Sequence, residues 1–376
     1  MKKLFCIFLA ICLTLSMSAC RKNKKDPTVD NTTNDTQSQD QTGGLYVEND
    51  MSLVAVSLPT QTQNEYHENG TVLFQYTFQH MTLVLQKPQV ADKIILDFLN
   101  RVDNTTSSAE STKEMAKNAY NGGQNWTPYL YHVTYSPTRI DHKVLSLFGN
   151  NVVFSGAGHP ERTCVSASYD LLTGDVLTLA SIMTKEATVQ QFCNLVISGL
   201  AEMAEGDYLY DNYKSVVQQR FQQDASQDEA WYFTQTGLCF YFAPYEIAPY
   251  SSGVITVEIP FEKLKNLIHE DYLLAKRTTP SGKVTITPFN QTNLSSLSHI
   301  AELVMDENGE MYMLQTDGNV QDVRIVLNDK ASNYTVFAAY NLSKENGIMI
   351  QGTVDALKNM KITYKADKES VTIPII

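Results

Sequence analysis

Apolar and polar residues alternate in several short segments of the chain, which is the period expected of half-buried β-strands. In the segment 71–78, for example, Val72, Phe74, Tyr76 and Phe78 would share one face. Further strands are predicted at 129–135, 144–154 (as one strand or two), 165–169, 231–242 and 254–259.

Elsewhere the apolar residues recur every three or four positions, which is typical of a helix with one buried face. One helix is predicted to begin at Pro88, because proline suits the first turn, and to bury Ile94, Phe98 and Val102. The polar stretch through Ser111 is expected to loosen or interrupt this helix. Other helices are predicted near 189–200, near 213–220 and after Pro260. Residues 46–275 are therefore predicted to form an α+β fold, with antiparallel sheets and helices packed on one face.

The pattern changes near Ser281, after which eight short strand-like segments follow within about 95 residues. The dipeptide Asn308-Gly309 predicts a hairpin turn between two of them. We expect a small all-β domain, sandwich- or barrel-like, at 281–376. It would follow two α+β domains, at 46–140 and 141–275, that pack together.

The N-terminus has the features of a secretory signal. Lys2 and Lys3 precede an apolar run over 4–15, which is too short to span a membrane. Ser18-Ala19-Cys20 resembles a bacterial lipobox, and we predict a signal peptide at 1–19 with Cys20 as the lipid-modified first residue, carrying palmitate or a similar chain. Ordinary cleavage, with Cys20 an incidental thiol, is the alternative. The polar stretch that follows predicts a disordered tether over 20–45.

Charge and motifs exclude several classes of function. The chain has 376 residues, a net charge of −12 and no basic stripe, which argues against nucleic acid as a partner. The nucleophile-elbow, zinc-protease and nucleotide-binding motifs are absent, so we expect no enzyme, metal or cofactor. Outside the signal and Cys20 the only cysteines are Cys164, Cys193 and Cys239, too few and too scattered for a disulfide framework or a zinc site. We predict that all three are core residues.

Three stretches of the chain look familiar. They read FSGAGHP at 154–160, SYDLLTG at 168–174 and GLCFYFAPYEIAPY at 237–250. In this order they resemble the paired extracytoplasmic domains of unknown function found in RsiV-type lysozyme-sensing anti-sigma factors and in the non-catalytic part of PdaC-type peptidoglycan deacetylases. The resemblance covers about 46–270, with a PdaC-like domain at 46–140 and an RsiV-like domain at 141–275. It departs at residues 156–159, where the family usually reads Gly-Gly-Ala-His.

Four residues in these stretches are candidates for ligand binding: His159, Tyr245, Glu246 and Tyr250. His159 follows two glycines that would let the backbone approach a ligand, and aromatic rings beside a carboxylate suit a sugar or a cationic protein surface. The structural alternatives are a strand-connecting turn for His159 and core packing for much of 231–250. Tyr245, Glu246 and Tyr250 are expected to be exposed.

The resemblance and the predicted anchor together imply a lipid-anchored, non-catalytic binding or sensing module of the bacterial cell envelope. Its expected partners are the membrane and either peptidoglycan or a lysozyme-like protein. A structural or accessory lipoprotein that docks another envelope protein through its β-rich tail is the alternative. A peptidoglycan-modifying enzyme is a third hypothesis.

Overall fold

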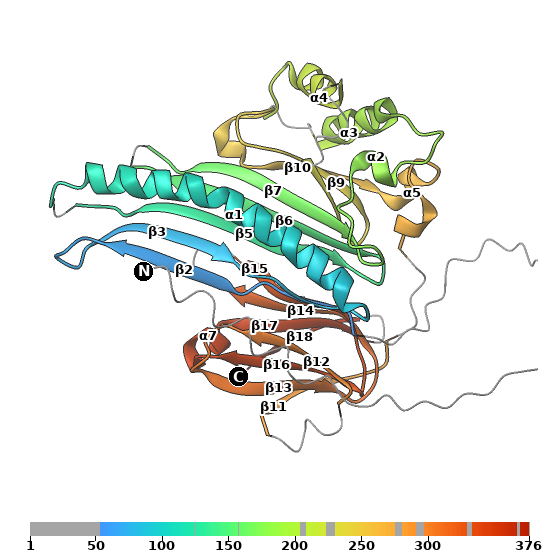
Figure 1. Ribbon diagram of the computed structural model, residues 1–376. Coiled ribbons are helices and arrows are strands. Elements are labelled where there is room, and N and C mark those ends of the chain that lie inside the picture. Colours follow the sequence, from blue (N-terminus) through green and yellow to red (C-terminus); the bar gives the residue numbers. More distant parts are fainter. Residues whose placement is uncertain are drawn as a thin grey trace, which may run out of the picture. The chain divides into compact units, whose positions relative to one another are not determined.

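The computed structural model describes residues 53–123, 125–156, 158–203, 208–222, 230–274, 280–290, 297–328, 333–366 and 369–375. The predicted signal peptide, Cys20 and the tether over 20–45 lie outside the described residues. The described residues belong to one compact unit, Leu45–Ile376. Their fold is α+β, as predicted, with several antiparallel sheets and few helices (Figure 1).

A five-stranded sheet has the order β2-β3-β5-β6-β7. Neighbouring strands are antiparallel except for β3 and β5. Burial alternates along most of β5, as its sequence predicts, because one face packs against a helix. The bounds are β2 Thr60–Tyr66, β3 Val72–Gln79, β5 Tyr129–Ile140, β6 Val144–Phe154 and β7 Glu161–Asp170.

The long helix α1 (Pro88–Ala119) lies along one face of this sheet (Figure 1). It buries Phe98, whose ring contacts that of Tyr135 on β5. The predicted interruption near residue 111 is wrong, because the buried stripe continues through Ala109, Thr112 and Ala116. Hydroxyl groups in the polar stretch bond within the helix, as from Thr112 to the Ser108 carbonyl. None of the helices in the described part of the chain is long and apolar enough to cross a membrane.

The segment from 179 to 274 forms a second core around the antiparallel sheet β10-β9-β8. Helix α3 packs on β10, and Gly199 permits this because a Cβ there would collide with Val257. The helices predicted near 189–200 and 213–220 are present, whereas the one after Pro260 ends within a single turn. The bounds are α2 Leu179–Ile182, α3 Val189–Met203, α4 Tyr213–Gln222, β8 Trp231–Phe233, β9 Gly237–Phe242, η2 Tyr250–Ser252, β10 Ile255–Pro260, α5 Phe261–Leu264 and η3 Glu270–Tyr272.

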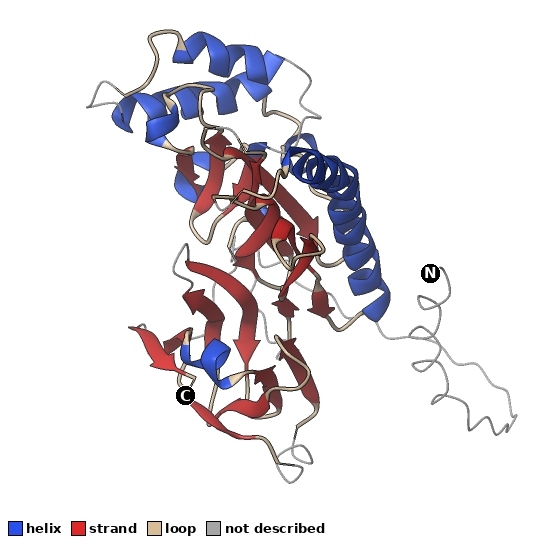
Figure 2. Ribbon diagram, turned by 90° about the vertical axis from the view of Figure 1, so that its left-hand side faces the viewer, coloured by secondary structure: helices blue, strands red, loops and turns tan. Residues whose placement is uncertain are grey.

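Two further sheets contain all eight strands predicted in 281–376. They have the orders β18-β17-β14-β15-β1-β4 and β11-β13-β16-β12 and share one apolar core. Both are open at their edges within the described residues, so this part is sandwich-like and not a closed barrel. Figure 2 shows it almost without helix, apart from the short α7 (Val354–Lys358). The bounds are β1 Ala55–Ser57, β4 Thr82–Val84, β11 Val284–Pro288, β12 His299–Val304, β13 Glu310–Thr316, β14 Val320–Asn328, β15 Asn333–Leu342, β16 Asn346–Gly352, β17 Met360–Ala366 and β18 Glu369–Pro374.

The strand pairing differs from two expectations. Asn308-Gly309 does not close a hairpin, because β16 lies between β12 and β13 and pairs with both. The expected boundary at 140/141 falls in the β5–β6 hairpin of one sheet. Strands β1 and β4, from the N-terminal part of the chain, extend the C-terminal six-stranded sheet.

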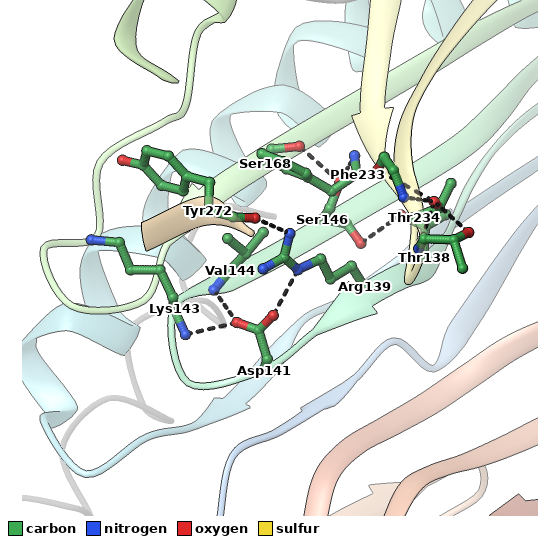
Figure 3. A network of polar contacts seen from close by, with 12 residues as sticks. Thr138, Arg139, Asp141, Lys143, Val144, Ser146, Ser168, Phe233, Thr234 and Tyr272 are labelled. Carbon is green, nitrogen blue, oxygen red and sulfur yellow. Dashed lines mark hydrogen bonds and ion pairs between the residues drawn. The ribbon is translucent and has the colours of Figure 1, made fainter. Parts of the chain in front are cut away.

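A buried polar network joins the end of β5 to the segment after α5 (Figure 3). The Arg139 guanidinium donates to Asp141 Oδ2 (2.6 Å) and to the Tyr272 carbonyl (2.6 Å), and it lies over the Phe233 ring. Burial opposes ionisation of Asp141. The Arg139 charge and backbone donors such as the Val144 N–H (2.7 Å) outweigh this and hold the pKa of the carboxyl below its usual value.

Candidate functional site

Three of the predicted site residues come together on the surface. His159 lies in the loop between β6 and β7, and Tyr245 and Tyr250 lie in the loop between β9 and β10. The His159 and Tyr250 rings stack with centroids 3.9 Å apart, and the Tyr245 ring lies 5.4 Å from Tyr250. We call these three residues the aromatic cluster. His159 and Tyr245 are exposed, whereas Tyr250, which we expected to be exposed, is half-buried because its ring stacks on His159.

Hydrogen bonds hold the two loops against each other. The Tyr250 hydroxyl donates to the Pro160 carbonyl (2.7 Å), and the Tyr245 hydroxyl lies 3.3 Å from His159 Nε2. Gly156, which precedes His159, has φ +90° and lies so close to the Tyr129 ring that a Cβ would collide with it. The close approach of Gly156 is therefore to the Tyr129 ring, within the protein.

Tyr245 has an unusual backbone. Its φ is +71°, a left-handed conformation that costs a residue with a Cβ roughly 1–2 kcal/mol. The tight turn that imposes it is closed by the Tyr245 N–H, which donates to the Ala248 carbonyl (3.0 Å). The side chain is 58% exposed, so little burial offsets this strain.

We expected Glu246 to be exposed, but the structure differs. Its side chain is half-buried, and its carboxylate accepts hydrogen bonds from Arg220 (3.0 Å) and from the Ala243 N–H (2.9 Å). The adjacent residues Tyr245 and Glu246 therefore have different surroundings, because only the tyrosine projects outward.

Glu246 instead lines a cavity of about 630 Å³ at β7. Arg101 of α1 and Arg220 of α4 also line it, together with Cys164 and Tyr241. Arg220 lies on a helix that the sequence predicts, but neither arginine has a predicted role, since no motif connects residues so far apart in the chain.

The three cysteines carry no disulfide. Cys193 and Cys239 are buried, as predicted, whereas Cys164 is only half-buried at the cavity wall. Burial, with a smaller contribution from the Glu246 charge, raises the pKa of Cys164 to about 11. Within the described ranges no three His, Cys, Asp or Glu side chains gather in a way that could hold a metal ion.

Comparison with known families identifies one part of the chain. Residues 180–262 match the family "Protein of unknown function (DUF3298)". The DUF3298 match begins in α2 and ends in α5, so it includes Tyr245, Glu246 and Tyr250 but not His159. It supports the expected domain of unknown function, while the likeness to RsiV and PdaC stays a prediction.

Two solved structures of DUF3298 family proteins are similar to this chain. One, from Bacteroides fragilis, has 14% sequence identity and a TM-score of 0.43, and the match covers 58% of this chain and 95% of that one. The other, from Pseudomonas aeruginosa, has 17% identity and a TM-score of 0.38, with 58% and 98% covered. Among curated proteins no sequence matches.

Proposed function

We propose that this protein is a non-catalytic binding or sensing module of the bacterial cell envelope that recognises the glycan of peptidoglycan through its aromatic cluster. A lipid on Cys20 would hold it at the outer face of the membrane, and the tether would give it reach. The anchor rests on the lipobox-like Ser18-Ala19-Cys20 and the signal-like segment before it.

The observation that carries the proposal is the state of Tyr245. An aromatic side chain stands exposed on a backbone conformation that glycine or asparagine would adopt at lower cost. Strain that local packing does not repay is typical of functional positions. A tyrosine offers a large rigid contact area at low entropy cost, and sugar rings present apolar faces that stack on such surfaces.

The geometry favours a glycan over a cationic lysozyme-like protein. Glu246, the carboxylate among the four candidate residues, is committed to Arg220 and to a backbone N–H, so it offers no free charge to a cationic protein. The acidic net charge would still speed encounters with a cationic protein, but this long-range effect specifies no site.

The test is a binding assay on the compact unit Leu45–Ile376. We expect it to co-sediment with purified peptidoglycan and to bind soluble N-acetylglucosamine oligomers. Tyr245→Ala should weaken both interactions about tenfold or more, the scale of a removed aromatic anchor. Tyr66→Ala is the matched control, because Tyr66 is equally exposed (57%) but lies on β2, away from the cluster.

Two outcomes would contradict the proposal. One is binding that Tyr245→Ala and Tyr66→Ala affect equally. The other is binding to lysozyme with none to the glycan, which would move the function to the protein partner.

A further inference from the structure

The cavity beside the aromatic cluster has the size of a small-molecule or short-peptide site, for which 300–1,000 Å³ is typical. Its charged lining residues are two arginines, Arg101 and Arg220, against one carboxylate, Glu246. Each guanidinium already has a carboxylate partner, Asp97 for Arg101 (2.7 Å) and Glu246 for Arg220 (3.0 Å), so the wall offers guanidinium donors and no uncompensated positive charge. The Cys164 thiol adds no negative charge near neutral pH, because its pKa is raised to about 11.

Arg220 has hydrogen-bond donors to spare. Its Nη1 donates to the Tyr241 carbonyl (2.8 Å) and to Glu246 (3.0 Å). Its Nε and Nη2 have no hydrogen-bond partner among the residues that the structure describes. A guanidinium fixed on one side and open on the other suits an incoming carboxylate, since arginine binds carboxylates with two parallel hydrogen bonds.

The cavity also meets a free strand edge. Strand β7 is the last of its sheet, and on its outer side the Ser168 carbonyl accepts from the Leu177 N–H (2.7 Å). In an antiparallel strand every second residue directs its backbone groups to the same side, so Cys164 also directs its N–H and C=O outward. Among the described residues nothing bonds to the Cys164 backbone there. An edge of this kind offers hydrogen bonds to a peptide backbone.

We propose that the cavity binds a short peptide with a free carboxylate, held by Arg220 and by the backbone of Cys164. The occupant to which this chemistry points is the acidic stem peptide of peptidoglycan, an identity that rests on the proposed function. The sugar would lie on the aromatic cluster and the peptide in the cavity. The two sites share a loop, because Tyr245 directly precedes Glu246.

The experiment is isothermal titration calorimetry of the purified protein with a synthetic stem tetrapeptide, and with the same peptide after conversion of every carboxylate to a carboxamide. The amidated peptide should bind about tenfold to a hundredfold more weakly, the scale of a lost hydrogen bond between charged groups. Arg220→Met should weaken the binding of the acidic peptide by a similar factor. Arg162→Met is the matched control, because Arg162 is exposed on β7 and does not line the cavity.

A second variant tests the same idea in the opposite direction and does not depend on the stability of Arg220→Met. Glu246→Gln removes the carboxylate that competes for Arg220, so it should tighten binding of the acidic peptide. A purely structural role for the Arg220–Glu246 pair predicts weaker binding in both variants. Equal binding of the acidic and amidated peptides, or no response to Arg220→Met and Glu246→Gln, would overturn the inference.

A peptide-free glycan separates this inference from the proposed function. If the glycan binds through Tyr245 and the stem peptide does not bind, the inference fails and the proposed function stands. If the stem peptide binds through Arg220 and the glycan does not bind, the cavity is a peptide site and the role given to the aromatic cluster is wrong.

Discussion

Replacement of Arg139 by methionine should be among the most damaging single substitutions in the protein. Arg139 and Asp141 are 1% and 3% exposed, so the variant would leave the Asp141 charge buried without its partner. It would also remove the donor to the Tyr272 carbonyl. Breaking a buried pair in this way costs about 3–5 kcal/mol. We therefore expect the free energy of unfolding to fall by that amount.

Urea denaturation of the wild-type protein and its variants measures this loss. Arg162→Met, at an exposed arginine, should change the free energy of unfolding by less than about 0.5 kcal/mol. The double variant Arg139→Met/Asp141→Asn should regain part of the loss, because it removes the unpaired charge while the amide oxygen can still accept from the Val144 N–H. A loss below about 1 kcal/mol in Arg139→Met, or a double variant less stable than the single one, would refute the reasoning.

The same pair sets a direction for the pH dependence. The pKa of Asp141 is lower in the folded than in the unfolded protein, where it is about 3.9. Its stabilising contribution is therefore complete above that value and is lost as the pH falls through the lower, folded pKa. Denaturation curves from pH 7 to pH 2 should show this loss in the wild-type protein and a smaller one in Asp141→Asn.

Three other predictions follow from single positions. Tyr245→Gly should be about 1 kcal/mol more stable than Tyr245→Ala, the reverse of the usual order, because only glycine relieves the positive φ; equal thermal midpoints would show that the turn is not strained. Burial raises the pKa of both Cys164 and Cys239 to about 11, so iodoacetamide should modify neither quickly at pH 8 until the protein is unfolded; rapid alkylation of the native protein, followed by mass spectrometry, would contradict this. Gly149→Ala should lower stability by about 1–3 kcal/mol, because its Cβ would collide with the Thr134 carbonyl of the neighbouring strand; an unchanged denaturation midpoint would show that the strands can separate there without cost.

Strands with a regular apolar face could be predicted from the sequence, and strands without one could not. The alternation in β3 and β5 is the direct result of one buried face, so the pattern was sufficient. Strand β2 reads TQTQNEY and is mostly exposed at the edge of its sheet, so it lacks that signal. Strand β1 is only three residues long, and its partner β15 lies far away in the chain. Local sequence patterns do not predict pairings between strands that are distant in the chain. The hairpin predicted at Asn308-Gly309 was wrong for the same reason, because the distant strand β16 lies between β12 and β13.

The candidate site was only partly visible in the sequence. Aromatic enrichment singled out Tyr245 and Tyr250, and the glycine-rich loop singled out His159. These residues contact one another only because the β6–β7 loop packs against the β9–β10 loop, and no local sequence pattern predicts that packing. Arg101 and Arg220 had none either, because isolated arginines on amphipathic helices usually lie on a solvated face and acquire a role only when distant elements pack together.

Strand β1 determines how mechanical load and truncation would act on this protein. It follows the N-terminal segment directly and pairs with β15 on one side and β4 on the other. Tension applied from the N-terminal side would meet β1 first, and hydrogen bonds on both its sides must break before the strand can leave the sheet. A chain that ends before residue 281 would lack β15 and the C-terminal core in which Leu53 and Ala55 are buried. If the shortened chain failed to bind an envelope protein, the cause could therefore be the disturbed N-terminal strand and not only the loss of a docking surface on the β-rich tail.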